Sequence, residues 1–128
     1  MALIPQVVNA EEASKLTLIK EAAETISALK LVKLNASDMF EIADKELYED
    51  ALVVGIAITA GAAGATIKAV ATGIVEDLAF NFPLNDLLFL GNNGTITNIA
   101  PTTGHNVPVG YSLGTGAIFL NIEKPEIL

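Results

Sequence analysis

The sequence predicts a mainly β fold, a small β-sandwich or barrel of two similar two-hairpin units, with an N-terminal arm and an α-helix ahead of it. Three observations predict it. Residues 87–122 contain no Asp, Glu, Lys or Arg and are rich in strand and turn signals. Residues 29–70 repeat the same order of features, as a duplicated unit would. Residues 10–28 instead show helical spacing.

The uncharged stretch 87–122 predicts two hairpins. A short apolar run at 87–91 leads to Asn93-Gly94, which can supply the two positive-φ residues of a type I′ turn. Further along, two β-rich runs flank Gly114-Thr115-Gly116, where glycine enters left-handed conformations without a Cβ clash. Globular sequence is about 25% charged. We therefore expect other protein chains to cover this stretch.

The earlier unit has a matching order of runs. Val54-Gly55 occupies the place in this unit that Val109-Gly110 occupies in the later one. The four runs of the earlier unit are 29–34, 39–43, 52–58 and 65–70, separated by a polar turn, an acidic loop and a glycine-rich turn. We interpret this as a degenerate duplication. The alternative is a chance likeness between short apolar strands.

Residues 1–28 are expected to form an N-terminal segment distinct from a β domain over residues 29–128. Pro5 lacks an amide donor, which favours an extended arm over residues 1–8. Asn9 and Glu12 fit a capping box, and apolar residues recur at helical spacing from there to residue 28. The stripe packs either on the protein's own sheet or on another subunit. The residues proposed for partner contact are Ile4, Val7, Val8, Leu16, Ile19, Ala23 and Ile26.

Composition limits the function classes. The 128 residues suffice for one domain, and 52% are hydrophobic while only 17% are charged, which favours self-association. Fifteen acids against seven lysines give a net charge of -8, which disfavours nucleic-acid binding because phosphates require clustered cations. The absence of cysteine excludes disulfides and thiolate catalysis. The apolar window 51–75 alternates at a two-residue period, so it predicts strands rather than a membrane span.

Motifs that resemble catalytic sites lack their required context. Gly110 to Gly114 matches the G-x-S-x-G pattern around Ser112, but that pattern requires a strand-to-helix turn and a later histidine. The only histidine, His105, precedes Ser112 and has no neighbouring acid to complete a metal site. We therefore predict no catalytic residue, no cofactor and no metal, and a protein that is not an enzyme. A small hydrolase using Ser112 and His105 is a rival interpretation.

The order of these motifs resembles the capsid decoration (cement) and head-fibre proteins of tailed bacteriophages. Such sequences combine a V-G-x-A strand, a strand into G-x-V, an L-F-L-G-x-x-G-x-[ILV]-T segment, and then P-T and V-G-x-[AS]-L. The corresponding segments here are 54–57, 73–75, 88–97, 101–102 and 109–113. The resemblance covers roughly residues 29–122. It departs from the family pattern at Ala36-Ser37-Asp38, where Asp-Gly is common, and residues 1–28 lie outside it.

The resemblance implies a non-enzymatic virion structural protein, usually a homotrimer, that decorates or projects from the capsid exterior and reinforces the shell. It would be made in the bacterial host cytoplasm, and its partners would be its own copies and the major capsid protein or another virion protein, with no nucleic acid and no membrane. Residues 1–28 would serve anchoring or trimerisation. The alternative function is a receptor- or carbohydrate-binding fibre module that uses the loops 101–106 and 114–116.

Overall fold

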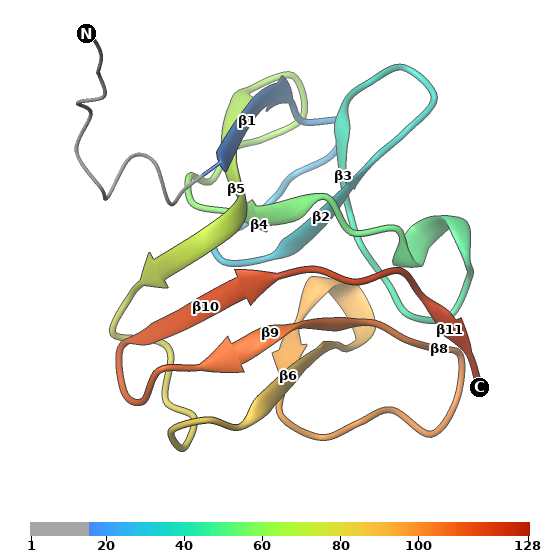
Figure 1. Cartoon of the computed structure of the whole chain (residues 1–128). Coiled ribbons are helices and arrows are strands. Elements are labelled where there is room, and N and C mark those ends of the chain that lie inside the picture. The colour runs from blue at the N-terminus through green and yellow to red at the C-terminus, as the bar shows by residue number, and fades with distance from the viewer. Residues whose placement is uncertain (1–15) are drawn as a thin grey trace, which may run out of the picture.

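The computed structural model describes residues 16–128, which fold into β-strands, turns and two short 3-10 helices (Figure 1). The strands are β1 (Leu16–Glu21), β2 (Leu31–Leu34), β3 (Phe40–Ile42), β4 (Gly55–Ala57), β5 (Thr66–Glu76), β6 (Leu87–Leu90), β7 (Ile96–Thr97), β8 (His105–Asn106), β9 (Pro108–Ser112), β10 (Ala117–Asn121) and β11 (Glu126–Ile127). The 3-10 helices are η1 (Glu49–Ala51) and η2 (Asn92–Gly94). The mainly β fold predicted from the sequence is confirmed.

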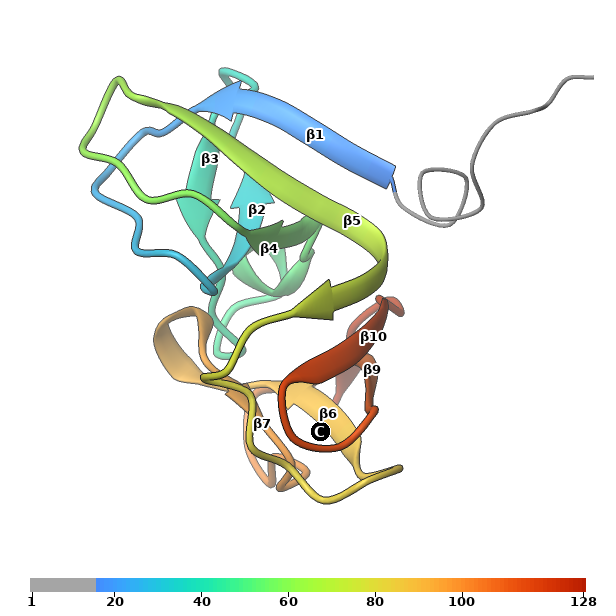
Figure 2. The ribbon, with the colours of Figure 1, turned by 90° about the vertical axis from the view of Figure 1, so that its left-hand side faces the viewer.

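Nine strands form one curled antiparallel sheet in the order β3-β2-β4-β5-β10-β9-β6-β7, with β1 paired to β5 in addition. Strands β8 and β11 form a separate two-stranded ladder. The long strand β5 bends and belongs to both halves of the sheet, since it pairs with β4 and β1 along its first part and with β10 along its second (Figure 2). The two halves enclose a common core, as in a sandwich.

The two halves share one strand order. The first unit, β2 to β5, has the order β3-β2-β4-β5, and the second has β7-β6-β9-β10. The hairpin registers also match, because Leu34 pairs with Phe40 in the first unit as Leu90 pairs with Ile96 in the second. The two units meet where β5 pairs with β10. The similar two-hairpin units predicted from the sequence are therefore present in the topology.

The predicted helix over residues 10–28 is wrong for its described part. Residues 16–21 form strand β1, which pairs with β5, and residues 22–28 follow as an irregular segment of bends and a turn with single bridges at Ala22 and Ile26. The four residues with helical spacing therefore belong to different segments, because Leu16 and Ile19 lie on β1 whereas Ala23 and Ile26 follow its end at Glu21. The register shift in the β1–β5 ladder lies in β5, where Ala71 has no partner in β1. The capping pattern at Asn9 and Glu12 lies outside the described residues. Residues 16–28 thus belong to the same sheet and core as the β domain.

The turns follow their residue chemistry. Asn93 and Gly94 both have positive φ (55° and 70°), and the Thr95 N–H donates to the Asn92 carbonyl, as the predicted turn between β6 and β7 requires. Gly114 and Gly116 adopt φ of 99° and 91° between β9 and β10. In the first unit Asp38 has a φ of 62° in place of the glycine expected there. Aspartate tolerates this conformation better than most residues.

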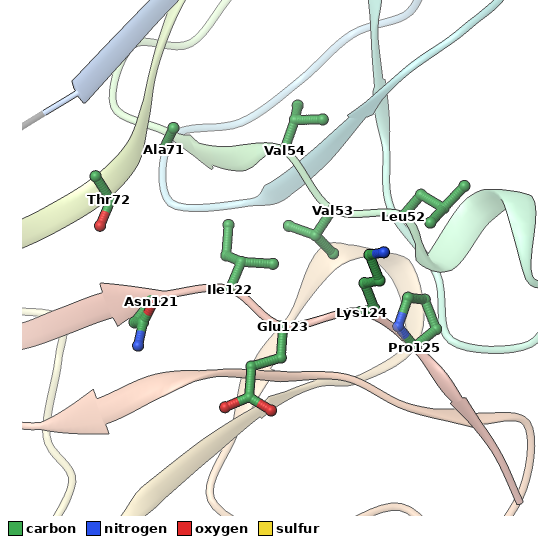
Figure 3. A pocket seen from close by; sticks show the side chains of 10 residues that line it. All are labelled: Leu52, Val53, Val54, Ala71, Thr72, Asn121, Ile122, Glu123, Lys124 and Pro125. Atoms are coloured by element: carbon green, nitrogen blue, oxygen red, sulfur yellow. The ribbon is translucent and has the colours of Figure 1, made fainter.

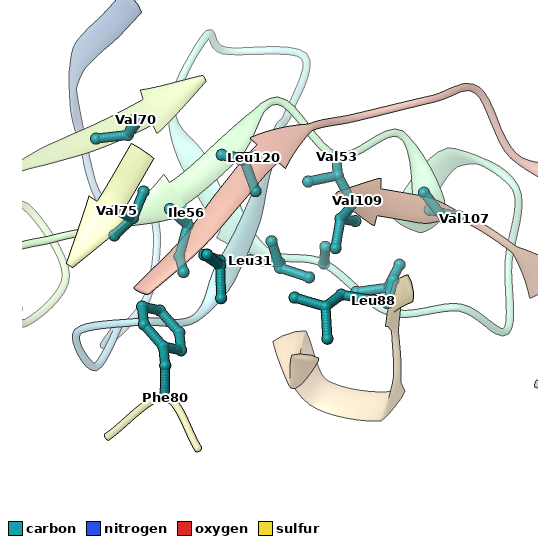
Figure 4. Close-up of a cluster of buried hydrophobic side chains, with 14 residues drawn as sticks. Leu31, Val53, Ile56, Val70, Val75, Phe80, Leu88, Val107, Val109 and Leu120 are labelled. Carbon is teal, nitrogen blue, oxygen red and sulfur yellow. The ribbon is translucent and has the colours of Figure 1, made fainter. Parts of the chain in front are cut away.

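The core has two parts. The larger one lies between the two units and includes Leu31, Ile56 and Val70 from the first unit with Leu88 and Leu120 from the second (Figure 4). The smaller one lies on the opposite face of the first unit and is formed by Ala22, Ile26, Val32, Phe40, Ala57, Ile67 and Ala69. The first unit is therefore covered on both faces. The second unit is covered by the larger core on only one.

The acidic loop that follows β3 in the first unit forms hydrogen bonds with the β6–β7 turn of the second unit. The Asp44 carboxylate accepts hydrogen bonds from the backbone N–H groups of Asn93 (2.8 Å) and Glu46 (3.0 Å), and from the Asn92 side chain (3.3 Å). Partial burial raises the pKa of Asp44, but these hydrogen bonds outweigh it and hold the pKa below its ordinary value. The charged form of Asp44 therefore stabilises the contact between the units.

At Gly110 a side chain would clash with the neighbouring strand, whereas at Gly114 only the positive φ disfavours a side chain. Substitutions at the two glycines therefore separate the steric effect from the conformational one. A Cβ at Gly110 would lie 1.9 Å from the Phe119 carbonyl oxygen at a φ of 148°, whereas a Cβ at Gly114 would meet nothing within 4 Å. We predict that Gly114→Ala lowers the free energy of unfolding by about 1–2 kcal/mol and Gly110→Ala by more than about 3 kcal/mol. Denaturant titration measures both, and equal losses would contradict the geometry.

Asp44 predicts a pH dependence of stability. Because its folded pKa is depressed, its contribution is present above the unfolded pKa of about 3.9 and is lost as pH falls through the folded pKa. We predict that Asp44→Asn lowers the free energy of unfolding by about 1–3 kcal/mol at pH 7 and makes its decline below pH 4 shallower. The matched control is Glu76→Gln on the exposed side of β5, which should preserve the wild-type pH profile. An unchanged profile for Asp44→Asn would refute this role.

Candidate interaction surface

The uncharged stretch 87–122 is divided between the protein's own core and its surface. Leu88, Leu90, Val109, Ile118 and Leu120 are buried inside the chain, which accounts for part of the missing charge. Of the residues between them, Tyr111 is exposed and Phe119 is half-buried, whereas Phe89 is only 8% exposed. The expectation that other chains cover this stretch therefore applies to its outer face alone.

Four apolar side chains form a continuous row on that outer face, here called the outer strip: Ile74, Phe119, Tyr111 and Leu87. Each lies directly opposite the next, since Phe119 pairs with Ile74 and Tyr111, and Tyr111 pairs with Leu87. Directly paired residues of antiparallel strands point to the same face. At about 4.8 Å between strands, the row crosses β5, β10, β9 and β6 over about 14 Å.

The outer strip is exposed in the single chain. Leu87 is 62% exposed, Ile74 40% and Tyr111 38%, while Phe119 is half-buried. The Tyr111 and Phe119 rings pack against each other with centroids 5.4 Å apart. Leu113 continues the apolar surface beyond Tyr111. A contiguous apolar face of this kind, without a charged side chain in the row, is typical of an interaction surface.

The proposed contact residues of the N-terminal segment lie in different environments. Leu16 and Ile19 on β1 are 56% and 62% exposed, and Ala23 is half-buried. Ile26 is fully buried in the smaller core, so it stabilises the subunit itself. Ile4, Val7 and Val8 lie outside the described residues. The outer strip was not among the contact residues predicted from the sequence. Residues 117–120 are all apolar, so the sequence does not show which of them turn outward.

Ser112 and His105 do not form a catalytic pair. Ser112 is fully buried at the end of β9, where its hydroxyl donates to the Phe82 carbonyl (3.0 Å) and accepts from the Gly114 N–H (3.0 Å). His105 precedes it by seven residues of mostly extended chain, about 20 Å, at the other end of β9 (Figure 1). Its backbone N–H and its Nδ1 both lie within 3.0 Å of the Lys45 carbonyl oxygen, which can only accept. Both residues therefore stabilise loops.

Lys33 is a further buried residue that could carry out chemistry, and it is 9% exposed. Its ammonium lies 2.7 Å from Asp50 and 3.3 Å from Glu41, and the hydrogen bond to Asp50 raises the pKa of Lys33 against the opposing effect of burial. A lysine with a raised pKa stays protonated at neutral pH and is a poor nucleophile. In the second unit Phe89 occupies the corresponding position in the hairpin register. The three charged side chains therefore form an ion cluster at the position where the second unit has the apolar Phe89.

Two surface hollows lie at loops. The first, of about 380 Å³, lies where β10 ends beside the chain entering β4, and its lining is mainly apolar with Glu123 and Lys124 at the rim (Figure 3). The second, of about 410 Å³, is lined by loop residues 99–103 and the β6–β7 turn. None of its ten lining residues is aromatic, although sugar-binding sites commonly stack a ring on the ligand. Residues 16–128 contain no group of three His, Asp or Glu side chains placed to hold a metal ion.

Comparisons with known proteins identify no relative. No protein-family model matches the chain, and no curated protein sequence matches it. Within the described residues, no helix is both long and apolar enough to cross a membrane. The outer strip is therefore the feature on which a functional proposal rests.

Ser112 should matter for stability and not for chemistry. We predict that Ser112→Ala lowers the free energy of unfolding by about 1–3 kcal/mol, because the Gly114 N–H and the Phe82 carbonyl lose the fully buried hydroxyl that pairs with both. Thr115→Ala, an exposed change in the same turn, should have little effect. Turnover of activated esters should be the same for Ser112→Ala and wild type. An ester hydrolysis that disappears with Ser112 would contradict this assignment.

Proposed function

We propose that the protein is a non-enzymatic structural protein of a tailed-bacteriophage virion, which decorates or projects from the capsid exterior as a homo-oligomer, most simply a trimer, and reinforces the shell. The observation that carries the proposal is the uncharged second unit, whose outer strip exposes apolar side chains on a face that the single chain leaves uncovered. Such a face is typical of a protein that assembles with further copies or with a larger particle.

Three further observations support the proposal. The motifs of residues 29–122 follow the order found in decoration and head-fibre proteins. Four of the five segments overlap strands of the sheet, and residues 101–102 lie in a loop. The net charge of -8 gives no basis for contact with nucleic acid inside a particle. Apolar contacts at about 25 cal/mol per Å², repeated over many symmetric copies, stabilise a shell even where each contact is weak.

The test of this function uses the virus that encodes the chain. We predict that purified particles contain the 13.3 kDa chain in many copies, and that antibody against it labels the outside of intact particles. Particles made without the gene should still assemble and should release their DNA at a lower temperature in a thermal-release assay. Absence of the chain from purified particles would end the proposal.

The N-terminal segment is proposed to anchor the protein to the shell. Ile4, Val7 and Val8 supply apolar side chains, and residues 1–10 carry no charged side chain. We predict that deletion of residues 2–8 lowers occupancy on particles at least tenfold while the mass of the free oligomer stays the same, as measured by quantitative gel and light scattering. Undiminished occupancy would refute anchoring by this segment.

A further inference from the structure

The first unit shows how a row equivalent to the outer strip is covered. Leu31, Ile56 and Val70 lie directly opposite one another across β2, β4 and β5. In the shared register of the two units they correspond to Leu87, Tyr111 and Phe119. Leu31 pairs with Ile56 as Leu87 pairs with Tyr111. Ile56 pairs with Val70 as Tyr111 pairs with Phe119. The chain therefore contains the same row twice.

The row of the first unit is buried, whereas the row of the second unit is partly exposed. Leu31 and Ile56 are fully buried and Val70 is 3% exposed, because Leu88 and Leu120 of the second unit pack on them (Figure 4). The corresponding row of the second unit has no third unit to cover it within the described chain. The first row is thus buried by a β unit of the same fold. A β unit of a second copy could cover the second row in the same way.

Charge and the covering of the first row favour a second copy of this chain as the occupant. Residues 87–122 contain no Asp, Glu, Lys or Arg, so the parts of two such faces on β10, β9 and β6 approach without the repulsion that a net charge of -8 imposes elsewhere. The acid that borders the strip is Glu76, which is exposed two residues beyond Ile74 on β5 and pairs with Ala117. On the other border Thr72 pairs with Asn121, and neither side chain is charged.

We propose that the outer strip of one copy packs against the outer strips of neighbouring copies around a shared symmetry axis, as the subunit contact of the oligomer. This inference rests on the proposed function for its homo-oligomer and assigns that contact to Ile74, Phe119, Tyr111 and Leu87. Tyr111 and Phe119 lie in the middle of the row and so contribute most, since aromatic residues at the centre of an interface dominate its energy. The N-terminal segment remains available for contact with the shell.

The test replaces one central side chain and one matched control. Tyr111→Lys should raise the dissociation constant of the oligomer at least about 30-fold, as measured by sedimentation equilibrium, because a lysine ammonium would be buried without a partner. Ile99→Lys is the control, since Ile99 is a 73% exposed apolar residue of the same uncharged stretch outside the strip. It should leave the dissociation constant within about twofold of wild type. Circular dichroism and denaturant titration establish that both variants fold.

Cross-linking gives a second readout that does not depend on destabilisation. The chain has no cysteine, so Tyr111→Cys should form disulfide-linked copies under mild oxidation and Ile99→Cys should not. A wild-type oligomer that survives Tyr111→Lys and is not cross-linked through Tyr111→Cys overturns the strip assignment while self-association stands. A wild-type monomer overturns both the strip contact and the homo-oligomer, whereas presence on particles tests the virion role separately.

Discussion

Strand β5 holds the structure together, because it pairs with strands of both units and brings their inner faces into one core. The bend of β5 places Val70 and Val75 in the same cluster although they lie on parts of the strand that pair with different units. Burial of Leu31 and Ile56 beneath Leu88 and Leu120 follows from that bend. Gly110 lets β9 approach β10 closely within the second unit. The Asp44 contact with the β6–β7 turn joins the first unit to the second.

The hairpins were predictable from the sequence because their signals are local. Asn93-Gly94 and Gly114-Thr115-Gly116 determine turns through the φ angles that their residues permit. The helix prediction failed because β1 is determined by a partner about fifty residues away in β5, while its apolar residues, taken together with Ala23 and Ile26 beyond its end, recur at three- and four-residue spacing. The local sequence of a strand does not indicate which distant strand it pairs with. The same limit explains why Ile26 was expected at a surface and is buried in the core.

The candidate site was predictable only in part. Absence of charge from 87–122 indicated that something covers the second unit, but the sequence could not separate residues buried by the chain itself from residues left for a partner. That separation depends on which face of each strand turns inward, and Gly110 changes the alternation between Val109 and Tyr111, since both would otherwise share a face. Ile74 joins the row from the first unit's own strand, because β5 crosses into the second half of the sheet.

The two units contain the same row of apolar side chains, but in the single chain the row is buried in the first unit and partly exposed in the second. The first unit has its smaller core on one face and the second unit on the other, whereas the second unit has a partner on one face alone. Assembly with further copies would complete the pattern without any new type of contact, which is the property that the proposed function requires. The most direct test is an electron cryomicroscopy map of the native assembly. The account predicts that Tyr111 and Phe119 lie against another protein chain, and a map in which both face bulk solvent on every copy would contradict it.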